Sequence, residues 1–465
     1  MIQARTAENP RAFERQAGLL RWAYRPRLAL WLFVVALVVR LALLGVTFRG
    51  NEAVKFYDDA KIAINLVAGN GYAVDYTYRN FLLYEAVMTE SGKLDNPITA
   101  GTRTTALKQP VYALFLAAVF WLAGTKNFLA VFLIHAVISS LTVSFLYLIL
   151  KRASPLSALI VALGAIFYPP FMGHPVTVPE STTLHLFLIA SLVLCLVKIR
   201  EQASAALWAL SGALGAIAIL TEPIMMSFVG LALAYAAYLD RRELRVRATA
   251  LAMSLVVMAM VLAPWLIRNY LVFDRFPLLK TGAMGHIFVW GLKYSGSGSW
   301  IPDEKIIELE KAGRALNEVE EEDAIQREVM ASFPNHWVQY VTKEIPQHFA
   351  YLWWDTPDYW SDYSLRYLAG RRIPFLLLLC LALPQMWRTA AGLLKRTRQT
   401  LLGEVPEVSA LMLLTVFTGV YSLVGAFHSR YRLPLELGLF ILAAGTVKPY
   451  IEALAVRWTA PARTR

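Results

Sequence analysis

The sequence predicts an all-α protein that crosses a membrane about ten times, and three observations favour this fold class. First, 57% of the 465 residues are hydrophobic and only 17% are charged, whereas about a quarter of the residues in soluble domains are charged. Second, apolar runs of roughly 20 residues, enough helix to cross a bilayer, recur along the chain. Third, most charged residues stand between these runs. Strands of a membrane barrel would instead alternate over about 10 residues.

The predicted spans follow one another with short connections, apart from two long loops. They are 28–48, 127–150, 155–171, 181–199, 205–221, 223–240, 248–267, 373–390, 408–427 and 433–448.

Basic residues set the expected orientation. With a cytoplasmic N-terminus, Lys151, Arg152 and the run 241–247 fall in cytoplasmic connections, as the positive-inside rule requires. The run 110–124 is only 15 residues long and would invert this pattern if it crossed. We therefore expect it to be a juxtamembrane or re-entrant helix on the outer side. Topology thus explains the net charge of +12, and no nucleic-acid partner is expected.

The same pattern divides the chain into five regions. An arginine-rich start, with no cleavable signal, predicts an amphipathic helix on the cytoplasmic surface. The expected regions are the N-terminus 1–27, a transmembrane module 28–267 that includes the first outer loop 49–126, a second outer loop 268–372, C-terminal transmembrane helices 373–448 and a cytoplasmic tail 449–465.

Polar residues gather at the outer ends of these spans. A charge at the bilayer centre costs about 2.5–3.5 kcal/mol on insertion scales, so such residues usually face a cavity or a partner. Their convergence predicts one extracytoplasmic site. The candidates for the substrate cavity are Lys108, His174, Glu180, Glu222 and His428, and Glu436 belongs to the same outer set.

Asp58 and Asp59 are the candidate catalytic residues. The apolar stripe that follows them predicts a short amphipathic helix, with both acids in its first turn. One of them can be an N-cap, but one cap suffices. A carboxylate at the water–lipid boundary can act as a general base on a lipid-borne substrate.

The segment HSRYRLPLE predicts a phosphate site. Arg430 and Arg432, with Tyr431 between them, precede the last span from the outside, and guanidinium groups bind phosphate through paired donors. Anchoring to lipid headgroups is the alternative. Arg268 and Lys293 form a further polar edge and complete the predicted donor-phosphate set.

No metal-ligand motif accompanies these residues, so we expect no required cofactor, although paired aspartates can bind Mg²⁺ or Mn²⁺. Cys195 and Cys380 lie inside apolar runs and are expected to be core residues.

Together these segments resemble the GT-C superfamily of membrane glycosyltransferases. More narrowly, the chain is similar to the bacterial branch related to protein O-mannosyltransferases and the aminoarabinose transferase, which is like glycosyltransferase family 39. The segments that carry the resemblance, in order, are YDDAKIAINLVAGNGY, KQPVYALFLAAVFWLAG, VPESTTLHLFL, ILTEPIM, APWLIRNYLVFDRFP and HSRYRLPLELGLFILAAG.

The resemblance implies a GT-C fold, a polyprenyl-phosphate sugar donor and an acceptor that is a glycan, a lipid or a protein. It places the general base on Asp58 or Asp59 and the lipid phosphate on Arg430 to Arg432. It also implies a bacterial inner membrane, with the site facing the periplasm or the cell exterior. Relatives usually have Thr-Arg-Pro where this chain has Thr221-Glu222-Pro223, so a phosphate role for that turn is in doubt.

Two other functions remain open. A transporter or flippase of a lipid-linked saccharide would share the outer cavity, but should show polar or broken helices near the midplane and repeat symmetry. A surface-polysaccharide polymerase or ligase would release a lipid diphosphate instead of a monophosphate.

Overall fold

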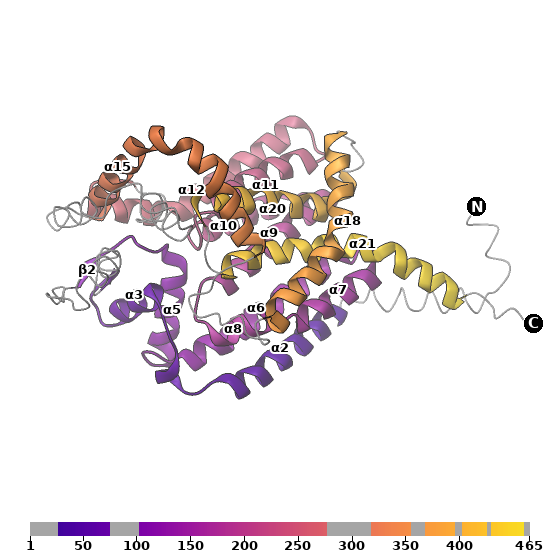
Figure 1. The fold of residues 1–465 in the computed structure, drawn as a ribbon, viewed down its shortest axis with the longest axis horizontal. Helices are drawn as coiled ribbons and strands as arrows, with labels where there is room; N and C mark the ends of the chain where they lie inside the picture. The colour runs from indigo at the N-terminus through magenta and orange to yellow at the C-terminus, as the bar shows by residue number, and fades with distance from the viewer. Residues whose placement is uncertain are drawn as a thin grey trace, which may run out of the picture.

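The computed structural model describes residues 27–74, 102–276, 318–354, 368–395, 402–425 and 429–459, which are almost entirely helical (Figure 1). Their two short strands, β1 (Ala73–Val74) and β2 (Arg103–Thr104), pair antiparallel. The predicted amphipathic segment, together with Lys293 and His428, lies outside the described residues.

Seven helices of the described part are long and apolar enough to cross a membrane. They fall on seven of the ten predicted ranges and confirm a multi-pass helical membrane protein. These helices are α2 (Arg27–Thr47), α6 (Phe128–Leu150), α9 (Thr182–Gln202), α12 (Leu244–Phe273), α18 (Ile373–Leu394), α20 (Val405–Val424) and α21 (Leu433–Thr459).

The other three predicted spans coincide with shorter or bent helices. The range 155–171 becomes α7 (Pro155–Phe167), which meets α8 (Pro169–Thr177) at a bend of 47°. Pro169 and Pro170 begin α8, and proline cannot donate the backbone hydrogen bond that would continue α7. The remaining two are α10 (Ala205–Ile219) and α11 (Met225–Leu239), each 15 residues long.

Close packing joins α10 to α12. A Cβ atom on Gly212 would lie 2.1 Å from the Ser254 carbonyl oxygen, so only glycine fits at this crossing. Such small residues let helix backbones approach closely inside a membrane. The contact holds α12, whose outer end carries Arg268, against the rest of the bundle.

The part of the molecule that carries Asp58 and Asp59 is built on two short helices. The helix α3 (Asp58–Val67) packs along α5 (Pro110–Ala123), and Asn65 ties α3 to the strand by donating to the Ala73 carbonyl at 3.0 Å. With 14 residues, α5 is about 21 Å long, which is short for a hydrocarbon core of about 30 Å. In Figure 1 these elements lie at the end of the molecule opposite the start of α2 and the end of α21.

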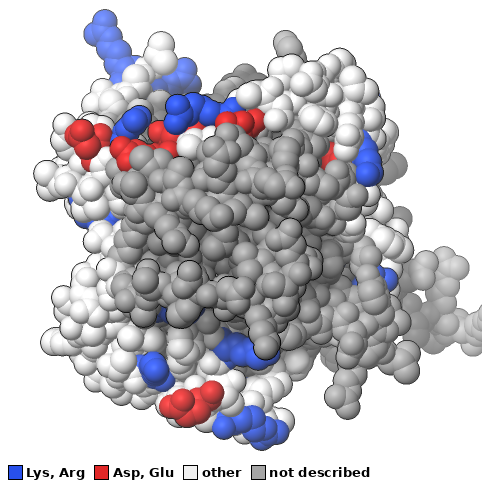
Figure 2. All heavy atoms as spheres, turned by 60° about the vertical axis from the view of Figure 1, so that its left-hand side comes forward, with Lys and Arg blue, Asp and Glu red and all other residues white. Residues whose placement is uncertain are grey.

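The segment between α12 and α18 contributes α15 (Glu318–Gln339), a π-helical turn (Tyr340–Glu344) and α16 (Ile345–Trp353). A hydrogen bond of 3.0 Å joins His348 Nδ1 and the Ser422 carbonyl, and it fixes α16 on α20. Figure 2 shows the molecule turned so that the left-hand side of Figure 1 comes forward, and charged side chains gather toward the upper and lower edges of that face. An exposed pair of this region, Arg275 and Asp323, is separated by 3.6 Å.

Candidate active site

The two aspartates occupy the first turn of α3, as the sequence predicts. Tyr57 is the N-cap residue of this helix, so neither acid serves as the cap, and that alternative is wrong. Both carboxylates lie at the positive end of the helix dipole. Asp58 Oδ2 is 3.7 Å from Lys108 Nζ, which links α3 to the segment before α5.

Asp59 has the more unusual environment. Removal from water raises the pKa of its carboxyl to about 6, and the neighbouring charges that act on it are Lys108, Asp58, Glu222 and Arg430. Lys108 and Arg430 favour the ionised form, whereas the two acids oppose it. A base with this pKa is well matched to proton transfer near neutral pH.

Lys108 interacts electrostatically with both aspartates and with Arg430. Burial acts to lower the pKa of its ammonium group, but Asp59 and Asp58 outweigh burial and the pKa is raised. Arg430 and Tyr431 also act on it. Lys108 is therefore charged, and residues from the first outer loop and the last span share one electrostatic site.

Arg430 is held by an acid from the middle of the chain. Its Nη1 donates to Glu180 Oε1 at 2.5 Å, and its Nη2 donates to the Tyr431 hydroxyl at 3.2 Å. The Arg430 side chain keeps 25% of its surface exposed. A guanidinium that is paired but still accessible can receive a second anion.

Arg432 is arranged differently from Arg430. Its side chain is 2% exposed, its Nε donates to Glu436 Oε1 at 2.9 Å, and its guanidinium carbon lies 4.2 Å from the centre of the Phe375 ring. The sequence predicts that Arg432 binds the donor phosphate, but the structure buries its side chain between α18 and α21. Within the short 3-10 turn Ser429–Arg432, Arg430 and Tyr431 are half-buried whereas Arg432 is buried, and the sequence alone does not indicate this difference.

Glu222 faces the same site through the turn between α10 and α11. Its Oε1 accepts a hydrogen bond from the Ser181 hydroxyl at 2.6 Å. Ser181 follows Glu180 in the chain, so the two acids are tied together. Glu222 is thus part of the cluster around Arg430.

Arg268 forms the rim. It donates to the Tyr72 carbonyl at 3.2 Å and its guanidinium carbon lies 5.2 Å from the Tyr72 ring centre and 5.0 Å from that of Trp265. The Tyr72 hydroxyl in turn donates to the Lys108 carbonyl at 3.0 Å. Arg268 therefore reaches the cluster through Tyr72.

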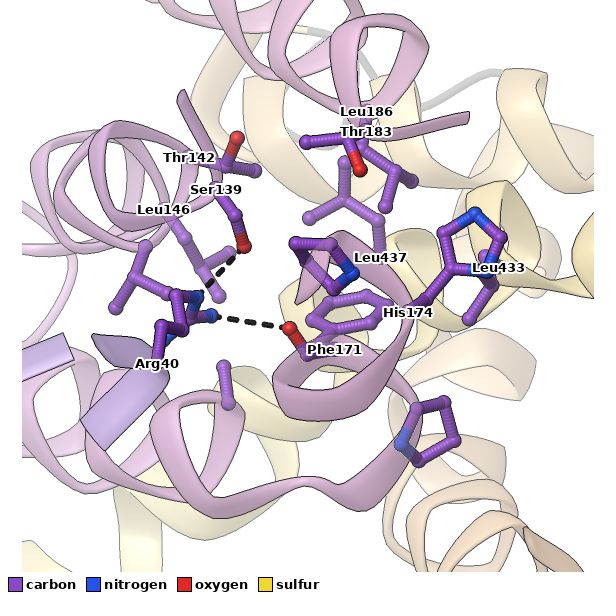
Figure 3. Close-up of a pocket in the computed structure, with 14 residues that line it drawn as sticks. Arg40, Ser139, Thr142, Leu146, Phe171, His174, Thr183, Leu186, Leu433 and Leu437 are labelled. Atoms are coloured by element: carbon purple, nitrogen blue, oxygen red, sulfur yellow. Dashed lines mark hydrogen bonds between the residues drawn. The ribbon is translucent and has the colours of Figure 1, made fainter. Parts of the chain in front are cut away.

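His174 lies elsewhere. It lines an internal cavity with Arg40, Ser139, Thr183 and Phe171, which has room for about one water molecule (Figure 3). Arg40 is fully buried there and donates to Ser139 Oγ at 2.8 Å and to the Phe171 carbonyl at 3.2 Å. The cavity is too small for a sugar, so His174 does not join the candidate site, and Arg40 serves to fix α8 against α2 and α6.

Several neighbours were missed from the sequence. Tyr72 and Tyr112 both lie within electrostatic range of Asp59, and the Tyr112 hydroxyl is 3.2 Å from His135 Nε2. Aromatic residues are frequent in membrane proteins, so nothing in their spacing distinguished these two. In the described part of the chain, no three His, Cys, Asp or Glu side chains are grouped as a metal site.

Comparison with known proteins adds to this geometry. Residues 107–267 match the family model described as dolichyl-phosphate-mannose-protein mannosyltransferase. That stretch includes Lys108, Glu180 and Glu222, but neither Asp59 nor Arg430. A search of curated proteins found no match.

Among solved structures, the chain is similar to ArnT from Cupriavidus metallidurans, crystallised with undecaprenyl phosphate. The TM-score is 0.51 at 16% identity, and the match covers 93% of this chain and 63% of that chain. The chain thus shares the fold of this ArnT and matches the mannosyltransferase family model over residues 107–267, both of which agree with the resemblance drawn from its motifs.

Proposed function

We propose that this protein transfers a sugar from a polyprenyl-phosphate donor to an acceptor at the outer face of a bacterial inner membrane. One observation carries the proposal: the first-turn acids of α3, with Lys108 3.7 Å from Asp58, share one electrostatic cluster with Arg430, which is far away in the sequence. A base and an anion-binding group in one cluster suit a group transfer from a lipid phosphate. ArnT, whose fold is similar, was crystallised with such a lipid.

Asp59 is the proposed general base. The acceptor, a hydroxyl or amine of a glycan, a lipid or a protein, gives its proton to the Asp59 carboxylate as its oxygen or nitrogen bonds to the anomeric carbon. Asp58, paired with Lys108 at 3.7 Å, holds the ammonium that keeps Asp59 ionised. A single displacement of this kind inverts the anomeric centre.

Arg430 is the proposed group for the leaving phosphate. As the bond between the anomeric carbon and the phosphate oxygen breaks, the electron pair stays on that oxygen. A guanidinium already in place stabilises the developing charge. Lys108 adds a second positive charge nearby, whereas we propose that the enclosed Arg432 supports the fold.

Enzymatic transfer is supported better than transport. The cluster of Asp59, Lys108, Glu180 and Arg430 lies on α3 and on segments between the spans, whereas a transporter would need its binding site near the midplane. The cavity beside Arg40, among the spans, has room for only about one water molecule. A polymerase or ligase would use the same outer site and differ in its product. The carrier released, lipid monophosphate or diphosphate, separates these two transferases.

A transfer assay with purified protein in nanodiscs tests the proposal. The donor is a polyprenyl-phosphate sugar with a radiolabelled sugar, and the product is separated from the lipid. We expect release of polyprenyl phosphate that depends on acceptor and is lost in Asp59→Asn. Donor turnover that continues unchanged in that variant would contradict the proposed base.

A further inference from the structure

The Glu180 carboxylate is paired with the Arg430 guanidinium, the group that we propose binds the donor phosphate. The 2.5 Å contact between Arg430 Nη1 and Glu180 Oε1 is the shortest ion pair of the described cluster. Hydrogen bonds between a guanidinium and a carboxylate are stronger than those between neutral groups. A phosphate that takes the position of Glu180 on Arg430 Nη1 displaces the Glu180 carboxylate, whereas the other N–H groups of the guanidinium could bind a second anion beside it.

Geometry allows this exchange. Glu180 lies in the turn between α8 and α9 (residues 178–181), outside both helices, so a change of its rotamer within its largely buried surroundings need not move a span. Its neighbour Ser181 stays bonded to Glu222 at 2.6 Å, which anchors the turn. The side chain of Arg430, at 25% exposed, is open to a ligand from the water–lipid boundary.

The negative charge around Arg430 favours the exchange over binding of a phosphate beside Glu180. Glu180 and Glu222 both act on Arg430, and a phosphate added beside two carboxylates meets repulsion from both. Movement of Glu180 removes the nearer of them. The second, Glu222, keeps its hydrogen bond from Ser181 and remains as a partner for the guanidinium.

We propose that Glu180 is a positioning residue that holds Arg430 in the empty site and yields it to the donor phosphate. The proposal rests on the proposed function. Its consequence is that donor affinity is set by competition: the Glu180 carboxylate weakens donor binding, although it lies in the binding site.

The test measures binding of undecaprenyl phosphate to full-length protein in nanodiscs, and the donor KM and kcat in the transfer assay. For Glu180→Gln, which keeps the shape but removes the charge, we expect binding about tenfold tighter and a lower donor KM with little change in kcat. Glu52→Gln is the matched control, since Glu52 is an exposed acid of the 3-10 turn Asn51–Ala53, outside the candidate site.

The sign of the change decides the outcome. Weaker or unchanged binding in Glu180→Gln, with a thermal midpoint equal to wild type, would overturn the exchange. A lowered midpoint is examined with Glu180→Asp, which keeps the charge and should retain wild-type affinity; tighter binding in that variant would also overturn it.

Arg430→Gln separates this inference from the function beneath it. If Arg430→Gln binds undecaprenyl phosphate as well as wild type, the proposed phosphate site itself is wrong. If Arg430→Gln weakens binding and Glu180→Gln fails to strengthen it, only the exchange is wrong.

Discussion

Arg430 and Arg432 stand two residues apart, and the structure gives them different surroundings. Arg430 bonds to an acid 250 positions away and keeps 25% of its side chain exposed. Arg432 bonds to Glu436 one helical turn later and keeps 2%. Sequence spacing made them equivalent, but the chain turns between them. An arginine at a membrane boundary is a ligand-binding candidate only when its enclosing neighbours leave it accessible.

Asp59→Asn should have the largest effect, because Asp59 belongs to the same cluster as the accessible Arg430 and is the proposed base. If Asp59 is the base, the transfer rate should fall about 100-fold or more, because asparagine cannot accept the proton. Binding of undecaprenyl phosphate should persist, since the donor site does not need the carboxylate.

Asp58→Asn is the matched variant for the transfer assay. It should reduce the rate less than Asp59→Asn, because it only removes the partner of Lys108. A larger loss in Asp58→Asn would exchange the roles of the two acids.

The two arginines should respond in opposite ways when each is changed to glutamine. Arg430→Gln should raise the donor KM about 10- to 100-fold, as expected for loss of a charged hydrogen bond. Arg432→Gln should instead cost about 3–5 kcal/mol of stability, because it leaves Glu436 buried without its partner.

Thermal unfolding and donor kinetics on both variants check this contrast. A similar rise in donor KM for both, with unfolding unchanged in both, would restore Arg432 to the phosphate site. A loss of stability in Arg430→Gln alone would reverse the assignment.

The sequence was sufficient for some parts of this account. Apolar run length placed seven spans, and the helix signature around Asp58 located α3. Burial inside an assembled bundle could not be inferred: it distinguishes Arg432 from Arg430, and it removes His174 to a cavity beside Arg40. Ion pairs between distant segments, such as Glu180 with Arg430, depend on tertiary packing that no local pattern encodes.

The effect of Lys108 on the pKa of Asp59 predicts how the transfer rate depends on pH. The active form of Asp59 is the carboxylate, so the rate should rise with pH through about 6. Lys108 lowers the pKa of Asp59, and Lys108→Gln should therefore move this acidic limb toward neutral pH. Rate–pH profiles at saturating donor measure the shift, with the exposed Lys55→Gln as control. An unmoved limb in Lys108→Gln would show that another group controls it.

Folding should respond to Asp59 in the opposite sense to catalysis. Its pKa is raised from 3.8 to about 6 on folding, so the protonated form favours the folded state. Its stabilising contribution is present below about pH 4 and is lost as pH rises through 6. Relative to wild type, Asp59→Asn should gain stability over this window, and a constant difference would contradict the assigned pKa.

The smallest effect is expected at Tyr72. In Tyr72→Phe the ring against Trp265 remains, but the hydroxyl that donates to the Lys108 carbonyl is lost. A neutral hydrogen bond contributes about 1 kcal/mol, so the rate should fall by about fivefold at most. A loss as large as that of Asp59→Asn would give the phenol a direct part in proton transfer.

The most direct measurement is a cryo-electron microscopy structure of the full chain with undecaprenyl phosphate bound. The account predicts phosphate oxygens within about 3 Å of the Arg430 guanidinium, with Asp59 facing the space that the sugar would occupy. Phosphate density remote from Arg430, or on the other side of the bundle from Asp59, would contradict the shared site on which the proposed transfer depends.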